Sequence, residues 1–488
     1  MKTILVVTSL LLMAIACTDR VSEDVRDAET MRDAGAASSD TGLIADSAAS
    51  DAGALPDVTD ASDASEPSED ADAAGPVDAV DAEDAAGRPD AVDAEDAAGP
   101  LDAIDAEDGG GPLDAIDAED VGSTDQSSAR DAAPPDATAI DGGATAGDAA
   151  CGSRCTGCVP EGPLVVDSSR AVRHSSLKMD GAGKTHVAYY DLDSHELRYA
   201  TNAAGSWRSV VVAQGSDVGQ YASLGIDAAG HMHIACYDAD SSDLRYATNA
   251  GGSFMTQAID TTGYVGSDTS LALDTAGHVH ISYYAIAEGL KYASNRSGSW
   301  RTEVADATIG VGEYSSLVLD STGTVVISYY DLVNGSLKVA TSTGAGAWRR
   351  SIVDAAGNVG QYSAIGVDRA NNLHVSYYQS SSANLRYATN AGGAWQATTI
   401  DSGGDVGKFS SLAVDENDKV HISYYDATNA GLKYATNAPG GWASSTLDGG
   451  DLRAFVGQYT SIALGAATVN ISYVDVVSGE LKYIARCR

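Results

Sequence analysis

Histidines that recur at one position of a repeated stretch are the first residues of this sequence that could do chemistry. Imidazole groups serve as metal ligands and as general acids and bases near neutral pH. One active site does not need a copy in nearly every repeat, however, and copies spread around a fold cannot converge on one ion. We therefore predict structural roles, with no catalytic residue, no metal site and no cofactor. The histidines are His186, His233, His280, His374 and His421, with Val326 and Asn470 in the other two copies.

Aromatic and basic residues also recur in nearly every repeat, which favours structural roles for them. Tyrosine pairs such as Tyr189-Tyr190 suit strands that are packed on both faces. A tryptophan in most copies, as at Trp207 and Trp395, could stack a sugar ring, but packing between strands explains the repetition better. The basic residue of each copy is expected to pair with the aspartate that ends the preceding strand. These basic residues are Arg198, Arg245, Lys291, Lys338, Arg386, Lys433 and Lys482, and the aspartates are Asp191, Asp238, Asp331, Asp426 and Asp475.

The phrase Val-Gly-x-Tyr is the recurrent motif that loops would present to a ligand. It occurs as Val218-Gly-Gln-Tyr221 and Val359-Gly-Gln-Tyr362, among others, near the aspartates that end a neighbouring strand. Seven similar clefts could each bind a sugar or peptide weakly and gain affinity by acting together. The candidate ligand-binding residues of these clefts are Gln220, Tyr221, Gln361, Tyr362, Asp191, Asp238, Asp331 and Asp426.

Departures from the repeat give a second candidate site. The loop from Asp448 to Phe455 is longer than its counterparts, and the stretch from Asp167 to His174 becomes its neighbour if the repeats close into a ring. Drift of loops at a seam would produce such a patch without any function, so both interpretations stay open. The polar residues of this patch are Asp451, Arg453, Arg173 and His174, together with Arg170.

A unit of about 47 residues, which recurs seven times after His174, must position these side chains. Each complete copy holds four short runs of β-branched and aromatic residues bounded by turn residues, which predicts four strands. The sequence therefore predicts an all-β fold, a seven-bladed β-propeller of four-stranded blades, with six or eight blades as alternatives. Most copies have an anchor aspartate followed three residues later by Gly or Asn, which predicts a tight turn. The anchors are Asp180, Asp227, Asp274, Asp320, Asp368 and Asp415, with Gly465 in the seventh place.

The ends of the repeat region predict how the ring closes. The seventh unit stops one strand short after Ile484, whereas Pro163–Asp167 matches the missing fourth strand. We expect this N-terminal strand to complete the last blade and remove its free edge.

The cysteines are consistent with that closure. Cys487 would lie beside the cysteines that precede the N-terminal strand, and an exported compartment permits disulfides. We predict a disulfide from Cys487 to one member of the group, with a zinc site as the competing interpretation. Cys236 replaces a repeated tyrosine, and we expect it to be a buried free thiol. The group consists of Cys151, Cys155 and Cys158.

Two segments ahead of the repeats carry no predicted fold. Residues 1–17 combine Lys2, an apolar run and small residues, which is typical of a secretory signal. Residues 18–150 hold 37 acidic residues against five arginines, with no lysine and no aromatic residue. Such a segment cannot bury enough apolar surface to fold, so we expect a disordered acidic linker, with calcium binding as a minor alternative. Residues 151–162 then form a cysteine-rich latch, and residues 163–488 form the propeller.

The ending Ala14-Ile15-Ala16-Cys17 resembles the lipobox of bacterial lipoproteins. That resemblance implies a lipid anchor on Cys17 and a place at the outer membrane or cell surface, with secretion as the alternative. The stretch from about Pro163 to Ile484 resembles the seven-bladed propellers of bacterial exported lipoproteins. More remotely, it is similar to the Asp-box propellers that include sialidases.

The favoured function is that of a surface-tethered, non-enzymatic binding module, a monomer that recognises a glycan or a protein through the propeller loop face. A sialidase-like, glycan-cleaving enzyme is the alternative, and it would need paired carboxylates across a cleft. Adhesion without a defined ligand is a third possibility. A formal net charge of −40 argues against nucleic acid as a partner, since contacts to phosphate dominate that affinity.

Overall fold

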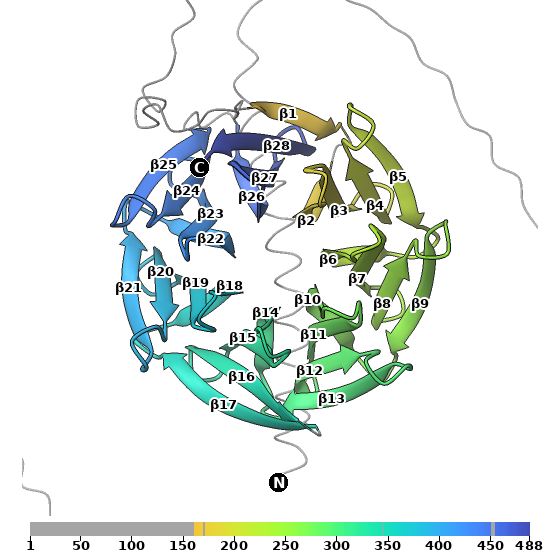
Figure 1. Ribbon diagram of the computed structural model, residues 1–488, viewed down its shortest axis with the longest axis horizontal. Coiled ribbons are helices and arrows are strands. Elements are labelled where there is room, and N and C mark those ends of the chain that lie inside the picture. Colours follow the sequence, from red (N-terminus) through yellow and green to blue (C-terminus); the bar gives the residue numbers. More distant parts are fainter. Residues whose placement is uncertain (1–160, 169–170, 345, 450–453) are drawn as a thin grey trace, which may run out of the picture. The chain divides into compact units, whose positions relative to one another are not determined.

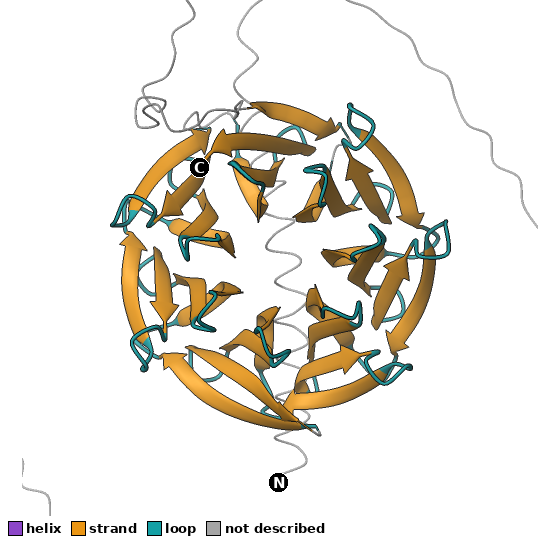
Figure 2. Ribbon diagram, in the orientation of Figure 1, coloured by secondary structure: helices purple, strands orange, loops and turns teal. Residues whose placement is uncertain are grey.

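The computed structural model describes residues 161–168, 171–344, 346–449 and 454–488, and these residues form seven four-stranded antiparallel sheets arranged in a ring (Figure 1). The seven-bladed propeller predicted from the repeats is confirmed. Strands and loops make up the described residues (Figure 2), and no helix among them could cross a membrane. Residues 1–160, which include the predicted signal, the linker and all but the last two residues of the predicted latch, lie outside the described part of the chain.

Each blade is named here by number, and its strands by position from A, nearest the central axis, to D at the rim. Blade 1 contains β2 (Val172–Met179), β3 (Thr185–Asp191), β4 (Glu196–Thr201) and β5 (Arg208–Ala213). Blade 2 contains β6 (Val218–Ile226), β7 (Met232–Asp238), β8 (Asp243–Thr248) and β9 (Met255–Asp260). Blade 3 contains β10 (Val265–Leu273), β11 (Val279–Ala285), β12 (Gly289–Ser294) and β13 (Arg301–Asp306). Blade 4 contains β14 (Val311–Leu319), β15 (Val325–Asp331), β16 (Ser336–Gly344) and β17 (Ala347–Asp354).

The remaining three blades follow the same order along the chain. Blade 5 contains β18 (Val359–Val367), β19 (Leu373–Gln379), β20 (Asn384–Thr389) and β21 (Gln396–Asp401). Blade 6 contains β22 (Val406–Val414), β23 (Val420–Asp426), β24 (Gly431–Thr436) and β25 (Ala443–Asp448). Blade 7 contains β26 (Val456–Leu464), β27 (Thr468–Asp475), β28 (Glu480–Cys487) and, as its D strand, β1 (Glu161–Asp167).

Blade 7 is therefore built from both ends of the propeller, as predicted. The N-terminal strand β1 pairs antiparallel with the C-terminal strand β28, and the register places Leu164 opposite Tyr483 and Asp167 opposite Leu481. Without β1, strand β28 would present a row of unpaired backbone groups at the rim. The pairing ties the first strand to the last and closes the ring.

The hydrophobic core lies between neighbouring blades. Strand B of each blade is packed on both faces, so its residues are almost all buried and its sequence reads as a continuous apolar and aromatic run. At the junction of blades 1 and 2, Ala188 and Leu197 pack against Leu224 and Ile234. A comparable cluster occupies the junction of blades 7 and 1, where Leu177 and Tyr189 meet Leu481. Every blade thus buries one side against each of its two neighbours.

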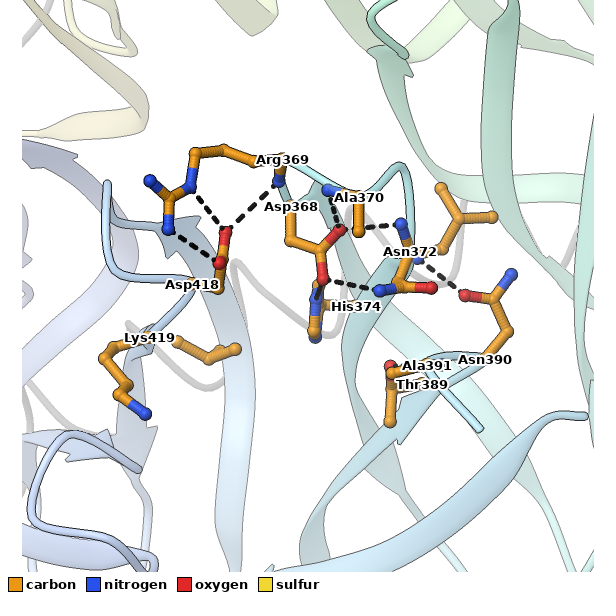
Figure 3. Close-up of polar contacts among 12 residues, drawn as sticks. Asp368, Arg369, Ala370, Asn372, His374, Thr389, Asn390, Ala391, Asp418 and Lys419 are labelled. Carbon is orange, nitrogen blue, oxygen red and sulfur yellow. Dashed lines mark hydrogen bonds and ion pairs between the residues drawn. The ribbon is translucent and has the colours of Figure 1, made fainter. Parts of the chain in front are cut away.

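The anchor aspartates hold the A–B turns as predicted. One carboxylate oxygen of Asp368 accepts hydrogen bonds from the backbone N–H groups of Ala370 and Asn372, at 2.9 and 2.7 Å (Figure 3). Asn371 adopts a left-handed φ of 63° in this turn, a conformation that asparagine and glycine tolerate. Neighbouring turns also touch, because Arg369 and Asp418 form an ion pair at 2.9 Å between blades 5 and 6 (Figure 3).

Two cysteines fall in the described residues. Cys236 is a buried free thiol, as expected, and burial raises its pKa to about 12. Cys487 is disulfide-bonded. Its predicted partner in the group Cys151, Cys155 and Cys158 lies outside the described residues, so the connectivity remains a prediction.

Candidate functional site

The glycine of the Val-Gly-x-Tyr phrase allows strand A to lie close against the preceding blade. In blade 6, Gly407 has a φ of +110°, and a Cβ atom there would lie 2.7 Å from the Cα of Leu385 in blade 5. The same close approach to the C strand of the preceding blade occurs at five further glycines. They are Gly219, Gly266, Gly312, Gly360 and Gly457. The phrase therefore marks the point where one blade is pressed against the next.

Two residues after this glycine in blades 2–7, strand A bulges and the residue at that point takes a left-handed conformation. Blade 1 lacks the glycine, but His174 takes the same conformation at the equivalent position. The φ angles lie between 49° and 54°, which is unusual for side chains other than Gly, Asn and Asp. A bulge of this kind re-aims a side chain. The seven residues are His174, Tyr221, Asp268, Tyr314, Tyr362, Phe409 and Tyr459.

Six of these side chains form a ring of touching aromatic groups, which we call the aromatic collar. The ring centroids of neighbours are 4.5 Å apart for His174 and Tyr221, 4.8 Å for His174 and Tyr459, and 4.6 Å for Phe409 and Tyr459. Tyr314 and Tyr362 continue the series at 4.5 Å. The collar is interrupted in blade 3, where Asp268 holds the equivalent position. Strand A is the innermost strand, so the collar surrounds the central axis.

A polar residue precedes each collar position, and we call this set the polar ring. Three members have side-chain contacts on the loop face. Gln220 donates to Asp217 at 3.2 Å, Lys408 pairs with Asp405 at 2.8 Å, and Arg173 donates to the Tyr459 hydroxyl at 3.3 Å. The polar ring is half-buried and includes Arg, Gln, Ser, Glu and Lys, whereas the residue before it is glycine in each of blades 2–7. Its members are Arg173, Gln220, Ser267, Glu313, Gln361, Lys408 and Gln458.

Tyrosines from strand B support the collar from below and join neighbouring blades. The hydroxyl of Tyr190 donates to Asp217 at 2.5 Å, and that of Tyr378 donates to Asp405 at 2.8 Å, each acceptor lying in the next blade. Tyr378 also lies edge-on to the collar residue Tyr362, with centroids 6.2 Å apart. Burial, together with the adjacent carboxylate, raises the pKa of both tyrosines, so they remain neutral donors.

The aspartates that end strand B are not open to a ligand. Asp191, Asp238, Asp331 and Asp426 are nearly fully buried. Their carboxylates accept hydrogen bonds within the B–C turns: Asp331 from the backbone and side chain of Asn334 at 3.0 and 2.9 Å, and Asp426 likewise from Asn429. Among the cleft residues proposed from sequence, the structure thus places Tyr221 and Tyr362 in the collar and Gln220 and Gln361 in the adjacent polar ring. The four aspartates are buried where strand B enters the B–C turn.

The pairing expected for the basic residues of strand C is only partly right. In most blades the shortest contact is to the aspartate that ends strand D of the preceding blade: Lys338 lies 2.8 Å from Asp306 but 3.6 Å from Asp331. The same Asp306 accepts a hydrogen bond from Tyr329 at 2.8 Å. The sequence pattern missed this because the partner comes from another repeat. Arg245 and Lys482 do pair within their own blade, with Asp238 and Asp475.

In most blades a B-strand tyrosine, a C-strand basic residue and the D-strand aspartate of the preceding blade form one polar set. In blade 2 the tyrosine and the aspartate are both replaced. Cys236 stands where other B strands have the tyrosine, and Ala213 stands where the preceding D strand has the aspartate. With both partners replaced, no buried carboxylate is left without a donor, and Arg245 turns to Asp238 at 2.8 Å. Cys236 is thus explained by packing.

The recurrent histidines form buried Asp–His–Tyr sets. His374 Nδ1 lies 2.6 Å from the Tyr387 hydroxyl, and its Nε2 lies 3.4 Å from Asp368 (Figure 3 shows the His374 side). Burial lowers the pKa of His374 despite Asp368, so the imidazole is neutral. An arrangement that resembles a catalytic relay is here a cross-strand brace on strands B and C. In blade 4, Val326 and Val339 stand at these positions instead, so both polar partners are again lost together.

The tryptophans that begin strand D pack against the C-strand tyrosine of the preceding blade. Trp442 meets Tyr387 with centroids 4.9 Å apart, and Trp207 meets Tyr483 at 5.3 Å. Their recurrence is accounted for by this packing between blades.

The asymmetric patch proposed at the seam is only partly described. Arg173 belongs to the polar ring and His174 to the collar, so both fit the general pattern of the loop face. Arg170, Asp451 and Arg453 lie outside the described residues. Tyr314 and Tyr459 also belong to the Val-Gly-x-Tyr phrase, although they were not singled out as binding residues. Phe409 and the break at Asp268 were not among the candidates, although their position in the repeat could have identified them.

Comparisons with solved structures find remote likenesses. A protein of unknown function from Dyadobacter fermentans DSM 18053 is 13% identical, with a TM-score of 0.43 over 67% of this chain and 98% of that one. AofleA from Arthrobotrys oligospora is 14% identical, with a TM-score of 0.42 over 58% and 89% of the two chains. The Aleuria aurantia lectin, described as a six-bladed β-propeller with a novel fucose recognition mode, is 15% identical, with a TM-score of 0.39 over 58% and 97%. No protein-family model matches the sequence, and no curated protein matches it.

Proposed function

We propose that the propeller is a non-enzymatic module that binds a glycan through the face formed by the D–A and B–C loops. The observation that carries this proposal is the set of seven left-handed residues at the mouth of the ring. Such conformations are retained where surrounding structure enforces them, and they cluster at sites of function. Here six of the seven deliver an aromatic side chain to the collar, and the seventh, Asp268, places a carboxylate at the break.

The chemistry of that surface suits a hydroxyl-rich ligand. Aromatic groups offer an apolar surface to a sugar ring, and the amides of Gln220, Gln361 and Gln458 both donate and accept hydrogen bonds. In blades 2–7 the polar ring includes Gln, Ser, Glu and Lys, while the glycine beside it is constant, as expected if the fold constrains one position and the ligand the other. A protein ligand is the second class that the same face could receive.

Catalysis is less well supported by the described residues. Their buried carboxylates are engaged by tyrosine, histidine, lysine or turn N–H groups, as at Asp306 and Asp368. The sialidase-like alternative needs an acid and a second carboxylate placed across a cleft. Loss of turnover on Asp451→Ala or Arg453→Ala would be the result that favours it.

A glycan array probed with the propeller fragment, residues 151–488, tests the proposal. We expect binding at several equivalents per chain, weakened by Gln361→Ala and by Tyr362→Ala. Arg208→Ala, an exposed change on the outer strand β5, is the matched control and should leave binding unchanged. An empty array, or signals that the collar variants do not alter, would contradict glycan binding at this face.

We further propose that Cys17 carries a lipid anchor and that the acidic linker holds the propeller away from the outer membrane or cell surface. A flexible chain of this length spans roughly 60 Å in root-mean-square extension, and mutual repulsion of its charges lengthens it. Fractionation of cells that express the full chain and Cys17→Ser is the test. The variant should move from the membrane to the soluble fraction, whereas unchanged partitioning would refute the anchor.

A further inference from the structure

A cavity of about 590 Å³ opens between blades 3 and 4. It lies among the β12–β13 hairpin, the β16–β17 hairpin and the A–B turn of blade 4. These connections are at the opposite ends of the strands from the collar, so the cavity belongs to the other face of the ring. Its volume is within the range of small-molecule sites. The lining residues that matter for recognition are Tyr292, Arg296, Arg301, Glu303, Ser342 and Trp348.

Two charged residues that line the cavity, Arg296 and Glu303, differ in type from the residues at the same positions of other blades. Arg296 stands at a hairpin position where blades 1, 2, 5 and 6 have alanine. Glu303 is the cross-strand partner of Tyr292, and no other described blade has a carboxylate at that place. The repeat acts as an internal comparison, because a residue type that the fold requires returns in each copy. The alanines are Ala203, Ala250, Ala391 and Ala438, and the counterparts of Glu303 are Leu164, Val210, Gln257, Ser351, Thr398 and Ser445.

Blade 4 supplies the other wall, and it departs from the repeat as well. Its C–D hairpin has one residue more than the corresponding hairpins, and its B and C strands carry the Val326 and Val339 pair. Trp348 lies with its ring centroid 5.3 Å from that of Tyr292, at an interplanar angle of 64°. Two aromatic groups from adjacent blades thus flank the cavity.

Glu303 is held in place by this wall. The indole N–H of Trp348 donates to its carboxylate at 3.3 Å. A carboxylate accepts about four hydrogen bonds, so capacity is left for ligand hydroxyl groups. Arg301 donates from Nε to Ser297 at 3.1 Å, and both Arg296 and Arg301 are exposed. Two guanidinium groups against one carboxylate make the cavity locally positive in a chain whose formal net charge is −40.

We propose that this cavity binds a single sugar ring that carries a carboxylate. Tyr292 and Trp348 provide the aromatic wall for the ring, and Glu303 accepts from its hydroxyl groups. Arg296 and Arg301 bind the carboxylate, for which the planar guanidinium is well shaped. This site is asymmetric and occurs at one blade junction, so it is independent of the repeated surface around the collar.

Ligand-observed NMR with matched monosaccharides tests this assignment on the full chain. The probes are methyl glycosides of glucuronic and galacturonic acid and of N-acetylneuraminic acid, with methyl glucoside and methyl galactoside as neutral counterparts. We expect at least one acidic glycoside to bind at least fivefold more tightly than the neutral ones. Arg296→Ala should weaken that binding at least tenfold. Equal binding of acidic and neutral sugars, or no binding of any probe, would overturn the proposal.

A matched pair of variants separates recognition from folding. Trp348→Phe and Trp442→Phe make the same change at the same position of two blades, and Phe254 shows that phenylalanine is accepted there. Only Trp348→Phe should weaken binding of the acidic sugar. Gln361→Ala, at the collar face, should leave it unchanged, so this proposal and the collar proposal can fail separately. Equal effects of the two tryptophan changes, or equally tight binding of an acidic dipeptide, would count against a sugar site here.

Discussion

The glycine two positions before the collar residue in blades 2–7 is the residue whose replacement the ring tolerates least. At Gly407 a side chain would both strain a φ of +110° and meet the backbone of Leu385. Gly393 provides the contrast, since its φ is +90° but no atom lies within 4 Å of the place that a Cβ atom would take. Gly393 is therefore required only by its backbone conformation, whereas Gly407 is required both by its backbone conformation and by its contact with Leu385.

We predict that Gly407→Ala lowers the free energy of unfolding by about 3 kcal/mol or more, through strain and a backbone clash. Gly393→Ala should cost about 1 kcal/mol, from strain alone. Urea unfolding of the two variants beside the parent protein measures the difference. Equal losses would mean that the close approach between blades relaxes without penalty.

The tyrosine hydroxyls of strand B are a second test at the level of residues. Tyr329→Phe removes one donor to the buried Asp306 but keeps the ring, and Lys338 remains as a partner at 2.8 Å. We expect a loss of about 1–2 kcal/mol in the free energy of unfolding. Tyr264→Phe, at a side chain that is 65% exposed, should change stability by less than about 0.5 kcal/mol. A null effect at both sites would show that Asp306 is satisfied without the hydroxyl.

At the scale of elements, the braces between strands B and C make stability depend on pH. Burial lowers the pKa of five histidines below the usual value, despite the nearby anchor carboxylates. In the unfolded chain these groups take up protons near pH 6.5, whereas in the folded blades they do so only at lower pH. The unfolded state therefore binds more protons as the pH falls below about 6.5, and stability declines.

We expect the urea midpoint to be constant between pH 7 and 8 and to fall steadily from pH 6.5 to 5. A second decline should follow in stronger acid. Burial alone would raise the pKa of Asp274, but hydrogen bonds from His278 and Ala276 lower it to about 2, so its contribution is lost as the pH falls from about 4 towards 2. A midpoint that does not change between pH 7 and 5 would contradict the neutral, buried state of the histidines.

The strands, their number and the closure of the ring could be predicted because each depends on periodic patterns within one repeat. The partner of Lys338 could not, since Asp306 lies 32 positions earlier in another blade and only the packing of blades brings the two together. Only part of the collar could be predicted, because some of its members do not carry the repeated phrase. Tyr221 and Tyr362 share an obvious phrase, whereas Asp268 and Phe409 reveal their role only through the register of strand A. The cavity beside Trp348 depends on residues that differ from the repeat, such as Arg296 and Glu303, and a search for residues shared by all repeats does not detect them.

On the scale of the whole molecule, the pairing of β1 with β28 closes the propeller. Cys487, at the end of β28, is disulfide-bonded beside this junction. A covalent link that closes a long loop stabilises the fold mainly by restricting the unfolded chain, by about 2–4 kcal/mol. We predict that Cys487→Ser lowers the thermal midpoint by several degrees. Reductant should lower the midpoint of the parent protein to a similar degree and leave the variant unaffected; an equal response of both proteins would refute a stabilising role for this disulfide.

Because β1 starts beside the end of β28, with Glu161 opposite Ala485, the two ends of the propeller are neighbours in space. The contacts between blades are also nearly the same at each junction. The present ends take the place of the C–D hairpin of blade 7. A circularly permuted chain, with these ends joined by a short linker and new ends opened in a D–A loop, would preserve all seven sheets. The contacts between blades therefore do not dictate where the ring is opened, and moving the ends to a D–A loop would carry the proposed tether from one face of the ring to the other.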